Sequence, residues 1–138
     1  TYIVKYSRAV KKRNLILNFL DIPGIKSRQH LEMNQEVIKH CQIIFITFST
    51  AESNWKQQVV NWLSFLKSCK QQQQMLVLIG TQIDLNPRFS FEQFQTFANK
   101  YRFAQYFLCS AKTGEGIQDI LEMPLPNNLK QYDINVEK

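Results

Sequence analysis

The sequence has no apolar run close to the roughly 20 residues that a transmembrane helix needs. It also does not begin with the charged and then apolar stretch of a secretory leader. It has only three cysteines, and their spacing is not that of a metal site: Cys41, Cys69 and Cys109. We therefore expect small, buried or half-buried thiols in an intracellular protein, cytoplasmic or organelle-associated and not secreted.

Length and composition indicate one ordinary globular domain. The 138 residues are 44% apolar and 20% charged, which excludes a disordered or fibrous chain. The net charge of +6 is concentrated near the start, at Lys5, Arg8 and residues 11–13. This cluster favours a solvated strand–turn–strand face, with anionic lipid, nucleic acid or an acidic protein as alternative contacts.

Apolar runs alternate with helical patterns along the chain. Strands are predicted at 2–10 and 15–20, paired through a turn at 11–14, and at 43–48, 75–80 and 103–109. The run at 43–48 is of the kind buried on both faces of a sheet. Helices are predicted at 55–66 and at 91–97, the second with Ser90 as N-cap, and 71–74 is read as a loop without function. The alternation predicts an α/β fold whose ligands lie at the carboxyl ends of a mainly parallel sheet.

The first suggestive motif, Asp21-Ile22-Pro23-Gly24, follows the strand at 15–20. An Asp at a strand end can hold Mg²⁺, because a hard cation prefers carboxylate oxygens. Gly24 would let the backbone approach a terminal phosphate. Taken alone, Asp-x-x-Gly is more often a turn.

Two further motifs follow later strands. In Thr81-Gln82-Ile83-Asp84, the carboxylate can accept hydrogen bonds from the ring N–H and the exocyclic amine of guanine, with Gln82 along the base. Asp84 could equally be an N-cap or an Asx turn. In Cys109-Ser110-Ala111-Lys112-Thr113-Gly114, a free backbone N–H can meet the guanine carbonyl and the lysine stem can cover the base. The alternative for this segment is a plain strand-to-helix turn.

The order and spacing of the three motifs are more specific than any one of them. Asp21 precedes Thr81 by about sixty residues, and Thr81 precedes Ser110 by about thirty. In this order the chain resembles a small GTPase of the Ras superfamily. Its guanine motif is similar to the Rho form, and its closing motif is similar to the Rab form.

The resemblance implies a fold, ligands and site residues. It implies a three-layer Ras-type P-loop NTPase sheet with helices on both faces over residues 1–122, followed by a tail at 123–138. It implies GTP or GDP with Mg²⁺ as ligands. The nucleotide-binding residues would be Thr81, Gln82, Asp84, Ser110, Ala111, Lys112 and Gly24, and the magnesium-binding residues Asp21 and Thr1.

The sequence departs from the family in three places. The phosphate loop Gly-x-x-x-x-Gly-Lys-Ser/Thr is absent, so we expect that the protein extends upstream of Thr1 or that another chain fills the gap. Ile25 stands where efficient GTPases have the Gln that positions the attacking water. Pro124 and Pro126 should stop the last helix near Glu122, and no cysteine for prenylation follows.

These departures bear on the expected function. We expect a guanine-nucleotide-binding protein with slow or absent hydrolysis. The alternative is a pseudo-GTPase that acts as a structural subunit of a larger complex. Either reading implies protein partners, and a nucleic-acid-associated factor rests on the charge alone.

Overall fold

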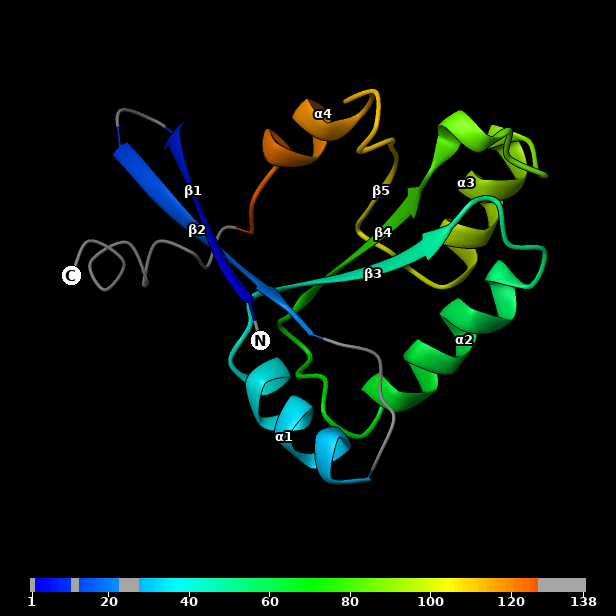
Figure 1. Cartoon of the computed structure of the whole chain (residues 1–138). Helices are drawn as coiled ribbons and strands as arrows, with labels where there is room; N and C mark the ends of the chain where they lie inside the picture. The colour runs from blue at the N-terminus through cyan, green and yellow to red at the C-terminus, as the bar shows by residue number, and fades with distance from the viewer. Residues whose placement is uncertain (1, 11–12, 23–27, 127–138) are drawn as a thin grey trace. The chain divides into compact units, whose positions relative to one another are not determined.

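The structure is a computed structural model that describes residues 2–10, 13–22 and 28–126. The chain divides into two compact units, residues 1–37 with 124–138 and residues 38–123. Figure 1 labels the elements of both. Each unit is described by itself.

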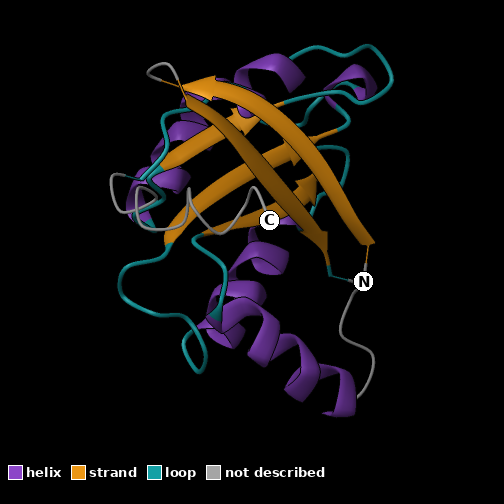
Figure 2. Cartoon of the chain, turned by 90° about the vertical axis from the view of Figure 1, so that its left-hand side faces the viewer, coloured by secondary structure: helices purple, strands orange, loops and turns teal. Residues whose placement is uncertain are grey.

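The first unit contains a long antiparallel hairpin. Strands β1 (Tyr2–Val10) and β2 (Arg13–Asp21) pair in register from Tyr2 opposite Asp21 to Val10 opposite Arg13. They form a two-stranded sheet of their own. Figure 2 draws all the strands of the chain, these two included, in orange. The predicted pairing is confirmed, and Asp21 lies at the carboxyl end of β2 as expected.

Helix α1 (Arg28–Lys39) follows the hairpin and was not predicted from the sequence. Its described side chains include two buried ones, Asn34 at 8% and Ile38 at 4% exposure. The helix crosses the division between the two units, which falls after Val37.

The second unit is built on a three-stranded parallel sheet. Its strands are β3 (Ile43–Ser49), β4 (Met75–Thr81) and β5 (Gln105–Leu108), in the order β3-β4-β5. Helix α2 (Trp55–Leu66) connects β3 to β4, and helix α3 (Phe91–Lys100) connects β4 to β5. These βαβ units confirm the predicted α/β class, because parallel strands need such crossovers.

One face of this sheet is packed by α2 and α3, which lie side by side (Figure 1). The Phe48 ring of β3 stacks on Trp55 of α2 at 4.6 Å, and Trp55 meets Phe97 of α3 edge-on at 4.8 Å. Phe94 is fully buried in the same cluster. Trp55 is therefore a core residue, as its helical spacing predicts.

The prediction that the run at 43–48 is buried on both faces is wrong. In β3, Ile46 and Phe48 are 4% exposed, but Thr47 between them is exposed and Phe45 is only half-buried. The reason is that β3 is an edge strand of the described three-stranded sheet. The central strand β4 fits the prediction better, since both Val77 and Leu78 are fully buried.

The loop at 71–74 has a structural role that the sequence did not suggest. Gln74 is 8% exposed, and its side-chain amide donates to the main-chain oxygens of Ile38 and Cys41. A buried amide satisfied in this way fixes the loop before β4. The loop therefore anchors the end of α1 to the start of β4.

Three smaller predictions are confirmed. Ser90 caps α3 in a reciprocal capping box with Gln93. The short helix α4 (Ile117–Leu121) has Glu122 as its C-cap, so it stops near Glu122 as predicted. None of the three cysteines forms a disulfide; Cys69 and Cys109 are buried and Cys41 is half-buried. In the described part of the chain, no helix is long and apolar enough to cross a membrane.

Candidate functional site

The loops that leave β4 and β5 run together at the carboxyl ends of the strands. The N–H of Cys109 donates to the Gly80 oxygen at 2.8 Å, and the N–H of Ile83 donates to the Cys109 oxygen at 3.2 Å. These bonds extend the pairing of the strands into the two loops. Two segments far apart in the sequence, 81–86 and 109–116, thus form one surface.

The loop after β5 folds back on itself. The Ser110 N–H donates to the Glu115 oxygen at 2.9 Å, and the Gly114 N–H donates to the Ser110 oxygen at 2.8 Å. Gly116 closes the loop with φ 78°, and a Cβ there would lie 2.2 Å from the Leu108 oxygen. Only glycine fits this position, so the strand-to-helix turn foreseen as an alternative is present too.

A buried hydroxyl joins the two loops. Ser110 is fully buried, and its Oγ donates to Oδ1 of Asp84 at 2.7 Å. The same Oγ accepts the N–H of Thr113 at 3.2 Å. Asp84, in the short 3₁₀ helix η1 (Ile83–Leu85), is thereby bonded across the loops and does not cap a following helix.

The Asp84 carboxylate keeps capacity for a ligand. The residue is exposed, and within the described part of the chain Ser110 is the donor bonded to it. An ionised carboxylate offers about four lone-pair sites, so Oδ2 remains open to further donors. The site can therefore accept hydrogen bonds from a ligand while Oδ1 stays fixed.

The first residues of the loop after β5 offer donors. Ala111 and Lys112 are exposed, and no main-chain acceptor in the described segments is bonded to the N–H of either. Their N–H groups follow the buried Ser110 directly. A ligand that presents paired donors to Asp84 and a carbonyl oxygen to these N–H groups suits the chemistry of this surface.

The ends of β3 and β4 are tied together beside this surface. The Thr81 hydroxyl donates to the Phe48 oxygen at 3.1 Å, and the N–H and hydroxyl of Thr50 donate to the Thr81 oxygen at 3.0 and 2.8 Å. Gln82 has φ 61°, and its Oε1 accepts the hydroxyl of Ser49. Thr81 therefore links the ends of β3 and β4, and the Gln82 side chain is bonded to the end of β3.

Comparison with known protein families supplies the identity. The family model described as Ras family matches residues 3–129, which is most of the 138-residue chain. The chain belongs to the Ras family. A comparison with curated protein sequences gives no significant match. The Ras family comprises small GTPases that bind GTP and GDP with Mg²⁺, and this chain has the α/β fold of that family.

The described surface at 81–86 and 109–116 contains only part of the predicted Ras-family site. Gly24 and Thr1, with Ile25, are outside the described residues. Asp21 ends β2 in the first unit, whereas Asp84 and Ser110 belong to the second. Within the described residues no group of three or more His, Cys, Asp or Glu side chains is placed to hold a metal ion.

The thiol beside the Ras-family base motif is not a chemical participant. Cys109 is 4% exposed, and burial raises the pKa of its thiol above the ordinary value. A raised pKa keeps the group protonated at neutral pH, and the thiol is a poor nucleophile in that form. Cys109 therefore acts as a small apolar side chain before Ser110.

Three site residues were not singled out from the sequence. Ser49 and Thr50 directly follow the third predicted strand, and Thr113 lies inside the closing motif. Their hydroxyl groups bond across or within the loops at the carboxyl edge of the sheet. Position at a strand end was the one available signal, because a hydroxyl side chain is common in any turn.

Proposed function

We propose that this Ras-family chain binds GTP and GDP by holding the guanine base between the loops that follow β4 and β5. Asp84 accepts the ring N–H and the exocyclic amine of guanine, and the Ala111 N–H donates to the carbonyl oxygen. The observation that carries this proposal is the 2.7 Å bond from the buried Ser110 hydroxyl to Asp84. It fixes the carboxylate before any ligand arrives, which lowers the ordering cost of binding.

The same arrangement favours guanine over adenine. Adenine lacks the paired donors, so its binding would desolvate Asp84 without replacing the lost hydrogen bonds. An unsatisfied group of this kind costs about 1–3 kcal/mol, or roughly ten- to a hundredfold in affinity. The Asp84 carboxylate, as a hydrogen-bond acceptor, thus makes the site selective for guanine.

Two long side chains cover the faces of the base. Lys112 is exposed and its aliphatic stem covers one face, while Gln82 covers the other. The hydrogen bond from Ser49 to the Gln82 oxygen supports this role, because it restricts where the glutamine side chain can lie. Thr81 acts indirectly: its hydrogen bonds to Phe48 and Thr50 hold the start of the loop that carries Gln82 and Asp84.

The phosphates and the metal ion engage residues of the other motif. By the Ras-family motif, Asp21 and Thr1 would hold Mg²⁺, and the Gly24 N–H would meet the terminal phosphate. The 138 residues contain no Gly-x-x-x-x-Gly-Lys-Ser/Thr motif, so within them the base contacts carry the larger share of nucleotide recognition.

Hydrolysis by this chain is slow or absent. Ile25 follows Gly24 and offers no hydrogen bond to an attacking water, which other GTPases orient with a glutamine. The motifs place the chain between two subfamilies, with a Rho-like Thr81-Gln82-Ile83-Asp84 and a Rab-like closing motif. We infer that it works inside the cell with protein partners.

A second candidate is a pseudo-GTPase that serves as a structural subunit. The observation that favours it is the short α4, which has five residues and ends at Leu121, shortly before Pro124. The edge strand β3 with its exposed Thr47 points the same way, since an edge strand offers a surface to a partner. In this reading the fold is kept for packing and the base site is empty.

The nucleotide content of the purified protein distinguishes the two candidates. The protein, purified with any upstream residues that its gene encodes, is denatured and the released nucleotide is identified by chromatography. Guanine nucleotide near one per chain supports the binder, and a high share of GTP supports slow hydrolysis. A folded protein that carries no nucleotide, and takes up none from GTP and Mg²⁺, would leave the structural subunit.

A further inference from the structure

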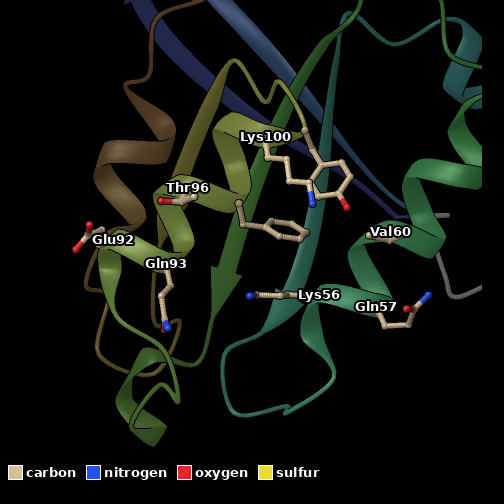
Figure 3. A pocket seen from close by; sticks show the side chains of 9 residues that line it. Lys56, Gln57, Val60, Glu92, Gln93, Thr96 and Lys100 are labelled. Atoms are coloured by element: carbon tan, nitrogen blue, oxygen red, sulfur yellow. The ribbon is translucent and has the colours of Figure 1, made fainter.

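A groove separates helices α2 and α3 on the surface of the second unit (Figure 3). Its volume is about 560 Å³, which lies within the range of about 300–1,000 Å³ typical of ligand pockets. Its lining includes Lys56, Val60, Thr96, Phe97, Lys100 and Tyr101. None of its lining residues belongs to the loops at 81–86 or 109–116, so the groove is separate from the base site.

Two ammonium groups enter the groove from opposite walls. Lys56 comes from α2 and Lys100 from α3, and Figure 3 shows both side chains directed into the space between the helices. The Nζ of Lys56 lies 5.7 Å from the Trp55 ring centre, and the Nζ of Lys100 lies 5.4 Å from that of Tyr101. These ring contacts restrain the lysines without neutralising their charge.

The acidic residue of the lining does not pair with these lysines. Glu92 is exposed, and in Figure 3 its carboxylate points away from both ammonium groups. Among the described residues, no salt bridge to Lys56 or Lys100 is formed. Both positive charges are therefore available to a ligand, while Glu92 places one negative charge at the edge of the groove.

Apolar surface lies between the two charges. Phe97 is 7% exposed, so a small part of its surface reaches the groove, and Val60 and Tyr101 are half-buried. Gln57, Gln93 and Thr96 complete the polar lining; Gln93 Oε1 already accepts the Ser90 N–H, and Gln57 Nε2 donates to Asn61. A ligand that fits must combine carboxylates or similar anions with an apolar group between them.

We propose that the α2–α3 groove binds an acidic segment of a partner protein. Two carboxylates of the segment pair with Lys56 and Lys100, and an apolar side chain between them packs on Phe97. The negative charge of Glu92 at the edge of the groove would repel a continuous polyanion such as a nucleic acid or an anionic membrane. A peptide segment with only two spaced carboxylates avoids this repulsion. This surface requires no nucleotide, so the proposal goes beyond the base site.

The test is a binding titration with a fluorescent peptide in which glutamates alternate with phenylalanine. The control peptide has glutamine in place of each glutamate. We expect the acidic peptide to bind the protein, and the double variant Lys56→Ala/Lys100→Ala to bind it about tenfold more weakly, from two ion pairs of modest strength. The matched control, Lys67→Ala/Lys70→Ala, removes the same charge at the other end of α2 and keeps the affinity.

Charge reversal makes the test sharper. Lys56→Glu/Lys100→Glu should lose the acidic peptide and bind a peptide in which lysines alternate with phenylalanine. Circular dichroism of every variant checks that the fold is intact. Equal losses in the two alanine pairs would mean attraction by net charge alone and would overturn the proposal. Equal affinity for the acidic and the glutamine peptide, or no binding of either, would overturn it as well.

Discussion

Replacing Ser110 with alanine removes one oxygen atom from the centre of the site. That oxygen donates to Asp84 at 2.7 Å and accepts the N–H of Thr113 at 3.2 Å. Ser110 is fully buried, so the loss of its hydroxyl leaves a small void. Asp84 then loses the group that fixes its Oδ1.

The expected magnitude follows from the character of these bonds. A hydrogen bond to a charged group contributes about 1.5–3 kcal/mol, and the lower end applies because Asp84 is exposed and water can solvate it. The Thr113 N–H is on an exposed residue and recovers a bond to water. We therefore expect Ser110→Ala to weaken GDP binding by about tenfold, which corresponds to about 1.4 kcal/mol.

The assay is a titration of nucleotide-free protein with a fluorescent GDP analogue, together with urea unfolding. Ser90→Ala is the matched control, because it removes the same atom from a hydroxyl that caps α3 outside the site. Loss of this N-cap costs about 1 kcal/mol of stability. Ser90→Ala should therefore lower the free energy of unfolding by about 1 kcal/mol and leave the affinity for GDP unchanged.

Two results would refute this reasoning. If Ser110→Ala binds GDP as tightly as the unaltered protein, the hydroxyl does not orient Asp84 for the base. If Ser90→Ala loses as much affinity as Ser110→Ala, the loss reflects general destabilisation and not the geometry of the site.

Other parts of the account lead to three further predictions. Gly116→Ala should lower the free energy of unfolding by at least about 3 kcal/mol in a urea titration, because φ is 78° and the new Cβ would lie 2.2 Å from the Leu108 oxygen. An unchanged urea midpoint would contradict the loop geometry. Ile25→Gln should raise single-turnover GTP hydrolysis by about tenfold or more by supplying a hydrogen bond to the water, and an unchanged rate would show that another group is limiting. Burial raises the pKa of the Cys69 and Cys109 thiols, so a disulfide reagent should label them more slowly in the folded than in the unfolded protein. The free energy of unfolding should also fall as pH rises past the ordinary thiol pKa of 9.0, because the thiols of the unfolded protein then release their protons first. Equal labelling rates in the folded and unfolded protein would contradict this.

Local patterns in the sequence were sufficient for the elements that have a strong apolar period. The apolar side chains at three- and four-residue intervals from Trp55 to Leu66 predict α2, and three of them, Trp55, Val59 and Leu66, are buried. Ser90 could be recognised as a cap because the apolar face of α3 starts next to it. These signals depend only on neighbours within a few turns of the chain.

Helix α1 was missed because its sequence carries little of that signal. Residues 28–39 are mostly polar, and the acidic residues that mark a first turn are absent there. Such a helix depends on what surrounds it more than on its own pattern. In a similar way, the apolar run of β3 did not reveal that it lies at the edge of its sheet, since an edge and a central strand can have the same composition.

The base site could be predicted as a set of residues but not as an arrangement. The sequence placed Asp84 and Ser110 just after predicted strands, and the structure shows that these strands are neighbours. The hydrogen bond between them joins positions 26 residues apart and depends on the parallel register of β4 and β5. The bond between Ser49 and Gln82 depends likewise on the register of β3 and β4.

The central claim is that Asp84 reads the base, and Asp84→Asn tests it most directly. Asparagine presents one donor and one acceptor where aspartate presents two acceptors, so it no longer matches the paired donors of guanine but does match xanthine, which has a carbonyl in place of the amine. The affinities of both proteins for GDP and xanthosine diphosphate are measured side by side. The account predicts that the variant loses GDP by at least about tenfold and gains the xanthine nucleotide. Unchanged GDP binding in a folded Asp84→Asn protein would contradict it.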